Sequence, residues 1–364
     1  MMSLAPFAPR ALPPLLPLNA LPSRPHPGGM SSLPLSVLDL SPITEGSDAG
    51  QSLRNSADLA LHVERLGYKR FWMAEHHSMP GIGSAATAVA LAFVGSQTSS
   101  IRIGAGGIML PNHAPLIIAE QFGTLESLFP GRVDLGIGRA PGTDQAAAFA
   151  LRRNLASGAD RFPDDIVELM GYFRGENGRV RAIPGEGLDI PIWILGSSLF
   201  GAQLAAVLGL PYAFASHFAP QMMMDAIAVY REQFKPSEQL AEPYVMLGFN
   251  AIVADSDEEA ELLATSVQRA FVSLRTGTPI KLPPPKRGYT DELPLDLRAM
   301  LRSVLSASAI GCPERARRQV QEFVDRTRPD ELIVTAQVYD HQARLRSYEL
   351  LMEAVRKPEI ASAK

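Results

Sequence analysis

The feature that most restricts how this chain can fold is a regular alternation of short apolar segments with segments of helical pattern, beginning at Leu33. Such an alternation is typical of a parallel sheet whose strands are joined by crossover helices. The chain holds about eight strand and helix units, the number found in a (β/α)8 barrel. We expect strands at residues 34–40, 70–77, 101–110, 132–138, 191–196, 212–216, 244–254 and 331–336.

An open, doubly wound sheet is the alternative architecture for the same pattern. That fold commonly carries a GxGxxG turn after its first strand, and no such motif follows residues 34–40. We therefore predict one α/β domain over residues 30–364, a closed (β/α)8 TIM barrel. Residues 276–294, between the seventh and eighth strands, are too rich in Pro and Gly for regular structure. They predict an extended loop that serves as a lid or as a partner surface.

The first 29 residues differ in composition from the rest of the chain. They are rich in Pro and contain no acidic residue, so they favour neither a regular helix nor a packed core. We expect a disordered leader over residues 1–29. Met30 is an alternative start, in which case the leader does not belong to the native protein. The leader shares its basic character with transit peptides, but its Pro content opposes the amphipathic helix that such peptides need.

Overall charge and cysteine content limit the classes of function. The 34 basic and 38 acidic residues leave a net charge of −4, which indicates neither a nucleic-acid surface nor a polybasic membrane anchor. No apolar run reaches the roughly 20 residues that span a bilayer. The single cysteine, Cys312, excludes an internal disulfide and a zinc-thiolate site and suits a reducing compartment. We expect a cytoplasmic protein that acts on small molecules.

Histidines follow the second predicted strand. The active site of a (β/α)8 barrel lies where the strands end, and this strand ends in Glu75, His76 and His77. Consecutive strand residues face opposite sides, so His76 and His77 cannot bind one metal ion without a bulge. We expect no metal site. One histidine in the core and one exposed is the ordinary interpretation, but the position at a strand end favours a functional role.

Glycines interrupt the third predicted strand at Gly104, Gly106 and Gly107. Glycine inside a strand lowers stability, and it often marks a bulge or a place where a ligand approaches the backbone. A flat ring lying against Gly106 and Gly107 is one interpretation. Close packing of a bulky neighbouring side chain is the other.

An anion site is predicted where the fourth and fifth strands end. Arg139 follows the fourth strand, and Gly196, Ser197 and Ser198 lead from the fifth strand into a helix. A guanidinium offers a planar fork of donors to a phosphate, and a helix start offers free N–H groups and a favourable dipole. A salt bridge for Arg139 and a simple serine N-cap are the ordinary alternatives. Because the two strands are adjacent, both groups can reach one phosphate.

Taken together, these segments resemble the luciferase-like flavin monooxygenase family, in particular its small single-gene members. The resemblance extends from residue 33 to the C-terminus and is carried by GYKRFWMAEHH, IRIGAGGIMLPNHAPLIIAEQFGTLESLFPGRVDLGIGRAPGTD and PIWILGSSLFGAQLAAVLGLPYAF. It implies a barrel that holds reduced FMN with the ring over the third strand. It also implies a non-prolyl cis peptide between Gly106 and Gly107.

The resemblance also implies roles for individual residues and partners. Arg139, Ser197 and Ser198 match positions that contact the phosphate, and His76 matches the active-site histidine, a general base or proton donor. Residues 276–294 fall where the family has a mobile loop. The chain shows no GxGxxG nicotinamide motif, so reduced FMN is expected from a separate flavin reductase. The resemblance further implies a homodimer.

The leading functional hypothesis is a monooxygenase that uses reduced FMN and O2 on an aldehyde-like or other small organic substrate. The fold family also includes dehydrogenases that use a deazaflavin, and such a dehydrogenase is the second hypothesis. A preference for deazaflavin over FMN would distinguish it from the monooxygenase. A non-catalytic flavin-binding protein is the third, and the presence of His76 favours catalysis over it. Neither the identity of the substrate nor light emission follows from these residues.

Overall fold

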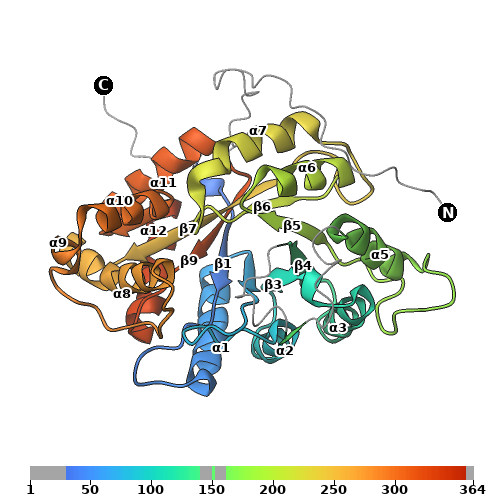
Figure 1. The fold of residues 1–364 in the computed structure, drawn as a ribbon, viewed down its shortest axis with the longest axis horizontal. Coiled ribbons are helices and arrows are strands. Elements are labelled where there is room, and N and C mark those ends of the chain that lie inside the picture. Colours follow the sequence, from blue (N-terminus) through green and yellow to red (C-terminus); the bar gives the residue numbers. More distant parts are fainter. Residues whose placement is uncertain (1–29, 140–149, 152–160, 358–364) are drawn as a thin grey trace.

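Parallel strands form a closed barrel in the computed structural model, which describes residues 30–139, 150–151 and 161–357 (Figure 1). Neighbouring strands pair in the order β6-β5-β4-β3-β2-β1-β9-β7, and a pairing of β6 with β7 closes the ring. The (β/α)8 TIM barrel is thereby confirmed, whereas the predicted leader, residues 1–29, lies outside the described residues. The barrel strands are β1 (Leu35–Asp39), β2 (Arg70–Met73), β3 (Arg102–Met109), β4 (Val133–Gly138), β5 (Ile192–Gly196), β6 (Tyr212–Phe214), β7 (Val245–Val253) and β9 (Glu331–Thr335).

Helices surround the barrel (Figure 1). The ends of α1 follow from its sequence. The Asp48 side chain accepts a hydrogen bond from the backbone N–H of Gln51 at the start of the helix, and Gly67 ends the helix in the left-handed conformation. The helices are α1 (Ala49–Leu66), α2 (Thr87–Gln97), α3 (Pro115–Leu128), α5 (Phe162–Arg174), α6 (Leu199–Leu208), α7 (Met223–Gln233), α8 (Asp257–Arg275), α9 (Tyr289–Glu292), α10 (Leu295–Val304), α11 (Pro313–Thr327) and α12 (His341–Arg356).

Two apolar clusters lie on the two sides of the barrel wall. Successive strand residues face opposite sides, so each strand contributes to both. Val37 of β1 packs outward in the large cluster beneath the helices, whereas Leu38 packs inward. The inner cluster is Leu38, Trp72, Ala74, Trp193, Ala213, Met246 and Ile333. These inward side chains fill the middle of the barrel, so the barrel is a packed core and not a channel.

Charged side chains fill the amino end of the barrel. Arg70, at the start of β2, donates from Nη1 to Asp134 of β4 over 2.7 Å and from Nε to Glu331 of β9 over 3.0 Å. All three residues are buried. Further partners of the two carboxylates are Ser36, Lys69, Trp72, Arg102 and Tyr244. This basal charge network (Arg70, Asp134 and Glu331) fills the amino end of the barrel. The carboxyl ends of the strands are where active sites of such barrels lie.

The region between β7 and β9 holds more structure than the sequence interpretation assigned to it. The predicted loop, residues 276–294, has no regular structure beyond the single-turn helix α9 and an isolated bridge from Leu282 to Thr44. After it come α10, the short strand β8 (Ser308–Gly311) and α11, which were not predicted. β8 pairs with the far half of β7 and lies outside the barrel ring. The helix α7 was also missed.

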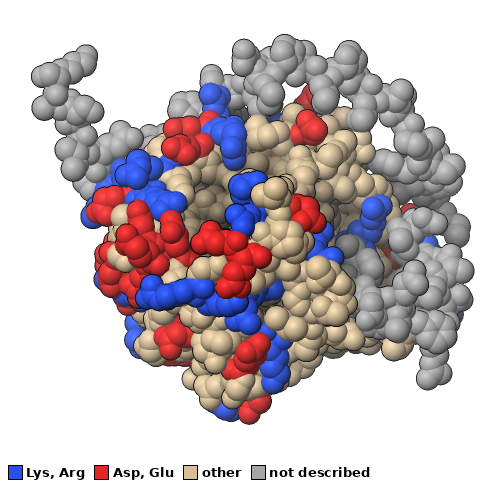
Figure 2. Space-filling view, turned by 60° about the vertical axis from the view of Figure 1, so that its left-hand side comes forward, with Lys and Arg blue, Asp and Glu red and all other residues tan. Residues whose placement is uncertain are grey.

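The surface carries charges of both signs. On the face shown in Figure 2, basic and acidic side chains are intermixed, and neither sign forms a broad patch there. Among the residues that the structure describes, no helix combines the length and the apolar character needed to cross a bilayer.

Candidate active site

The candidate site lies at the carboxyl ends of the barrel strands, a region that we call the barrel mouth. At the mouth, the pairing of β3 with β4 shifts register across Gly106 and Gly107, and the peptide bond between these two glycines is cis. A Cβ on Gly106 would lie 2.7 Å from Cδ1 of Leu38, and one on Gly107 would lie 2.8 Å from the carbonyl oxygen of Gly136. Close packing against backbone therefore requires glycine at position 107, whereas the contact at position 106 is with the end of a flexible side chain. Contact with a flat ring stays a prediction.

Arg139 lies beside the start of α6, as the sequence predicted. Its guanidinium carbon is 4.2 Å from the centre of the Phe200 ring, in the first turn of α6. This geometry follows from the sheet, because Gly138 of β4 and Leu195 of β5 are paired and the chain leaves both strands at the same level. Arg139 is exposed, so its donors are accessible to a ligand.

The start of α6 has the features of an anion site. Ser198 is the N-cap residue, but its side chain makes no capping hydrogen bond to its own helix, and the first turn carries no acidic residue. Ser197 is exposed directly before it, and Gly196 ends β5. The ordinary serine-cap interpretation therefore does not describe Ser198. The structure brings Arg139, the Gly196-Ser197-Ser198 turn and the positive end of the α6 dipole together.

A buried carboxylate organises the segments that follow β2 and β3. One oxygen of Glu75, Oε1, lies 2.7 Å from Nε2 of His77 and 2.8 Å from Nε2 of His113. The other oxygen accepts a hydrogen bond from the backbone N–H of Met109 over 3.1 Å. Burial alone would raise the pKa of Glu75, but the hydrogen bond from His113 and the other hydrogen bonds lower it.

Glu75, His77 and His113 are also a set of potential metal ligands, since their ligand atoms lie within 4.8 Å of one another. The short distances from both imidazoles to one carboxylate oxygen are those of hydrogen bonds. A charged carboxylate with three donors is fully satisfied without an ion. We therefore interpret the set as a clamp that fixes the mouth, and the absence of a metal site stays a prediction.

His76 is not one of the hydrogen-bonded residues of this clamp. Its backbone N–H approaches the carbonyl of Ser84 at 3.4 Å, and its buried Nδ1 has no hydrogen-bond partner among the residues that the structure describes. Burial lowers the pKa of His76 from 6.5 to about 4, with the charge of Glu75 acting in the opposite direction. The imidazole is therefore neutral at pH 7, the form that accepts a proton at one nitrogen and donates from the other.

A second histidine of the mouth was not predicted from the sequence. His217 follows β6 by three residues, and burial followed by repulsion from His76 lowers its pKa to about 4. Within the described part of the chain, its buried Nδ1 also has no hydrogen-bond partner. The signal in the sequence is its place after the sixth predicted strand, since His76 likewise follows the end of a strand.

The two histidines predict how stability depends on pH. Each has a folded-state pKa near 4 and an ordinary value of 6.5, so between these values the unfolded chain binds more protons than the folded chain. The free energy of unfolding should therefore fall as the pH drops from about 6.5 to 4, by up to about 1.4 kcal/mol per pH unit for each histidine. Urea unfolding across this range measures the slope. A His76→Gln variant should show a shallower slope, and an unchanged slope would contradict the prediction.

Residues 278–286 of the predicted loop pack against the mouth. Leu282 exchanges backbone hydrogen bonds with the segment after β1, at Ile43 and Glu45, and is buried. The carbonyl of Ile280 lies so close to Gly81 that a Cβ there would be 2.4 Å away. The loop thus crosses the segments that follow β1 and β2. Movement of this loop as a lid stays a prediction.

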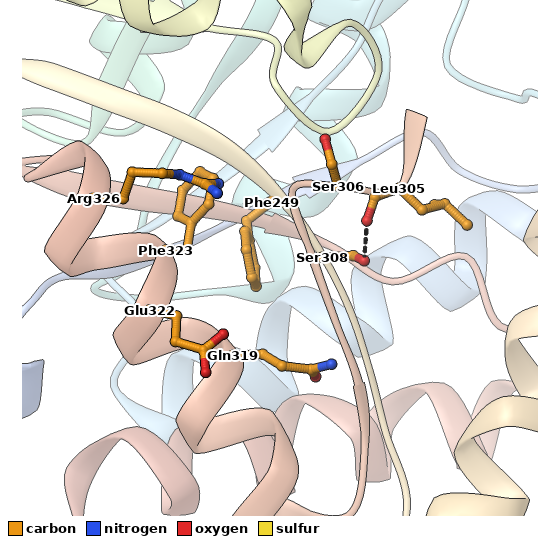
Figure 3. Close-up of a pocket in the computed structure, with 8 residues that line it drawn as sticks. All are labelled: Phe249, Leu305, Ser306, Ser308, Gln319, Glu322, Phe323 and Arg326. Atoms are coloured by element: carbon orange, nitrogen blue, oxygen red, sulfur yellow. Dashed lines mark hydrogen bonds between the residues drawn. The ribbon is translucent and has the colours of Figure 1, made fainter. Parts of the chain in front are cut away.

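A surface pocket of about 260 Å³ lies elsewhere, on the flank of the barrel between β7, the start of β8 and α11 (Figure 3). Its walls are Phe249, Leu305, Ser306, Ser308, Gln319, Glu322, Phe323 and Arg326. None of the residues described at the mouth contributes to it. We therefore place the candidate chemistry at the mouth and not in this pocket.

Comparisons with known proteins identify the family of this chain. Residues 33–329 match the family described as luciferase-like monooxygenase. A protein of Escherichia coli (strain K12) with that description is 50% identical over 324 residues, covering 88% of this chain and 97% of the relative. The structure of apo-MsnO8 has 34% sequence identity and a TM-score of 0.83, covering 88% of this chain and 98% of that one.

A more distant structure shares the fold alone. The oxygenating constituent of 3,6-diketocamphane monooxygenase of Pseudomonas putida, in complex with FMN, is 18% identical with a TM-score of 0.67, covering 89% of this chain and 98% of that chain. The family assignment rests on the match over residues 33–329 and on the closer relatives. This chain belongs to the luciferase-like monooxygenase family.

Proposed function

We propose that this protein is a flavin-dependent monooxygenase that uses reduced FMN and O2 on a small organic substrate, with an aldehyde-like molecule as the first class to test. The observation that carries the proposal is the meeting of Arg139 with the start of α6. There, the guanidinium is 4.2 Å from the Phe200 ring centre and the Ser198 side chain makes no bond to its own helix. A phosphate is the ligand that such a set of donors suits.

In this proposal Arg139, Ser197, Ser198 and the backbone at Gly196 hold the phosphate of FMN. The donor chemistry fits a dianion, because it combines a guanidinium, two hydroxyls and the N–H groups at the positive end of a helix of ten residues. The absence of an acidic residue in the first turn removes a source of repulsion.

The ring of the cofactor would lie over β3, at Gly106 and Gly107. Support comes from Gly138 at the end of the neighbouring strand, where a Cβ would have, among the residues that the structure describes, only the carbonyl oxygen of Ile108 within reach, at 3.9 Å. Open space next to the glycine bulge suits a flat group. When bound, reduced FMN supplies the electrons with which O2 is activated so that one oxygen atom enters the substrate.

The residues of the chain would orient the substrate, move protons and exclude water. The neutral His76 imidazole can take up or deliver a proton at a substrate oxygen. The floor beneath the mouth is apolar, with Leu38 and Trp72 buried in the inner cluster, which keeps bulk water away from below. The loop around Leu282 would close the mouth from above.

The partners of the proposed enzyme follow from the same reasoning. We propose that a separate flavin reductase supplies reduced FMN and that the protein works as a homodimer in the reducing cytoplasm. The dimer proposal gains support from α2, which has no charged residue and leaves Val89 72% and Phe93 43% exposed. Exposed apolar side chains on an uncharged helix suit a contact with a second copy of the chain.

Anaerobic titration with reduced FMN, reduced deazaflavin and NADPH tests the proposed function. We expect reduced FMN to bind most tightly, and stopped-flow mixing of the complex with O2 to show a spectral transient that free reduced FMN lacks. A preference for the deazaflavin would indicate the dehydrogenase instead. FMN binding with O2 kinetics identical to free FMN, unaltered in a His76→Ala variant, would indicate a non-catalytic flavin-binding protein.

A further inference from the structure

The turn that leads from β5 into α6 is not held by a serine cap. Ser198, the N-cap residue of α6, has the extended backbone of an N-cap, with φ −144° and ψ 168°, although its side chain makes no capping hydrogen bond. A serine at this position ordinarily fixes the first helical turn through its hydroxyl oxygen, which accepts from a backbone N–H. Another contact therefore fixes the backbone of this turn.

That contact comes from Tyr212, at the start of the neighbouring strand β6. Its hydroxyl donates to the carbonyl oxygen of Ser198 over 3.2 Å. Tyr212 is aligned with Ile194 of β5, which precedes Ser198 in the chain, so the tyrosine side chain extends along the sheet to reach the turn. Burial raises the pKa of the Tyr212 hydroxyl, so the hydroxyl is a protonated donor at pH 7.

The Tyr212 ring lies between the end of β5 and the first turn of α6. A Cβ on Gly196 would lie 3.6 Å from the Tyr212 hydroxyl oxygen, and one on Gly201 would lie 3.5 Å from Cε2 of the same ring. The tyrosine is fully buried in the large cluster beneath the helices, where α6 covers β5 and β6 (Figure 1). Packing therefore fixes the place of its hydroxyl.

Support through a carbonyl oxygen leaves the donors of the turn available. The first N–H groups of a helix have no acceptor within the helix, and a serine cap would take up one of them together with its own hydroxyl oxygen. Tyr212 bonds to neither group, because its acceptor is the carbonyl oxygen of Ser198. The turn is thus held in place without using the groups that suit an anion.

Arg139 has a similar aromatic support on the other side of the turn. Phe200 packs against the large cluster beneath the helices, and the centre of its ring is 4.2 Å from the guanidinium carbon of Arg139. A contact of this kind involves the face of the guanidinium, whereas the N–H groups lie in its plane. A guanidinium that is already placed loses less side-chain entropy when a ligand binds.

We propose that Tyr212 is a positioning residue of the anion site formed by Arg139 and the start of α6. By holding the carbonyl of Ser198, it keeps the Ser198 hydroxyl and the first N–H groups of α6 for the phosphate, where they would otherwise bond to each other. The identity of the ligand, the phosphate of FMN, rests on the proposed function. The support of the turn by Tyr212 is a property of the protein without cofactor.

Tyr212→Phe tests this role, because it removes the hydroxyl and keeps the ring. The Ser198 hydroxyl should then cap its own helix, and the affinity for reduced FMN should fall about two- to tenfold, the range of one hydrogen bond. Riboflavin lacks the phosphate, so its affinity should stay nearly unchanged. Anaerobic titration calorimetry measures both. A residue that only stabilises the fold would not separate the two ligands, so equal losses would overturn the proposal.

Tyr230→Phe is the matched control. Tyr230 is also fully buried, and its ring centre is 5.4 Å from that of Tyr212. Its hydroxyl donates to the carbonyl oxygen of Leu210 over 3.0 Å, beyond the C-terminal end of α6. The variant removes the same group from the same flank of the barrel, so it should lower stability without changing the ratio of FMN to riboflavin affinity. A change in this ratio as large as in Tyr212→Phe would contradict the proposal.

A double-mutant cycle with Ser198→Ala shows whether Tyr212 acts through Ser198. In the Ser198→Ala background no serine hydroxyl is left to cap the helix. Tyr212→Phe should therefore lower FMN affinity little further in this background, so that the two losses are not additive. Fully additive losses would mean that Tyr212 acts by another route.

Inorganic phosphate separates this inference from the proposed function. In the protein without cofactor, phosphate added at constant ionic strength should raise the midpoint of thermal unfolding. The rise should be equal in the parent protein and Tyr230→Phe, and smaller in Tyr212→Phe. If this pattern appears but neither flavin binds, the proposed function fails and the role of Tyr212 stands. A parent protein that does not respond to phosphate and binds FMN and riboflavin equally would overturn the inference.

Discussion

Replacing Arg139 with Ala should weaken the binding of reduced FMN roughly ten- to a hundredfold. A hydrogen bond to a charged group contributes about 1.5–3 kcal/mol, and each 1.4 kcal/mol corresponds to a factor of ten. Since the guanidinium is exposed, we expect the lower half of this range. Isothermal titration under anaerobic conditions measures the change. Arg139→Lys should lie between Ala and the parent protein, because lysine retains the charge but not the planar fork of donors.

Riboflavin provides a sharp control for this prediction, because it has the same ring without the phosphate. If Arg139 binds the phosphate, Arg139→Ala should leave riboflavin affinity nearly unchanged. Arg174→Ala, which removes an exposed arginine at the far end of α5, should alter neither ligand. A double-mutant cycle with Ser198→Ala should show non-additive losses if, as proposed, both residues contact one phosphate. Equal losses for FMN and riboflavin in Arg139→Ala would show that Arg139 acts elsewhere.

Replacing Arg70 with Met should lower the free energy of unfolding by about 3–5 kcal/mol, the usual cost of removing one partner from a buried ion pair. Arg70 bonds to both Asp134 and Glu331 in the basal charge network, and both carboxylates are fully buried. Without the guanidinium these charges lose their central partner. Urea unfolding at pH 7 measures the loss.

The matched control is Arg346→Met on the surface. Arg346 pairs with Asp255 at 3.1 Å and Glu349 at 3.0 Å, and its side chain is 45% exposed, so the loss should be about 1 kcal/mol or less. Adding Glu331→Gln to Arg70→Met should recover part of the stability, because it neutralises a carboxylate that has lost its partner. A loss in Arg70→Met no larger than in Arg346→Met would mean that the basal charge network does not stabilise the barrel.

Local patterns of apolar residues along the chain were sufficient to predict the (β/α)8 barrel. Each barrel strand was predicted within a few residues, because an apolar run followed by a helical pattern reflects the physical need to bury both faces of a parallel sheet. The strand β2 ends at Met73, whereas the prediction ended it at His77. Glu75, beyond the end of the strand, forms hydrogen bonds with His77 and His113 instead of continuing the sheet. The unpredicted β8 consists of Ser, Ala, Ile and Gly, so it lacks the run of large apolar side chains by which the other strands were recognised.

The nearness of Arg139 to the start of α6 was also predictable from the sequence, whereas the binding of an anion there stays a prediction. Arg139 and the Gly196-Ser197-Ser198 turn follow adjacent strands, so their meeting depends only on the order of strands in the barrel. The reason for the glycines at positions 106 and 107 was not readable. Packing against Leu38 and Gly136 involves residues of other strands, and their proximity depends on register and side-chain direction.

By itself the amino-acid sequence determined the closed barrel and which strand ends bring Arg139 beside the start of α6, because these depend on periodicity and on strand order. The tertiary structure alone decided which isolated polar residues meet. The hydrogen bond between Glu75 and His113, and the contact of His217 with Gly248, join segments that are distant in the chain. Contacts of this kind depend on the three-dimensional packing of single side chains, for which a sequence has no local period.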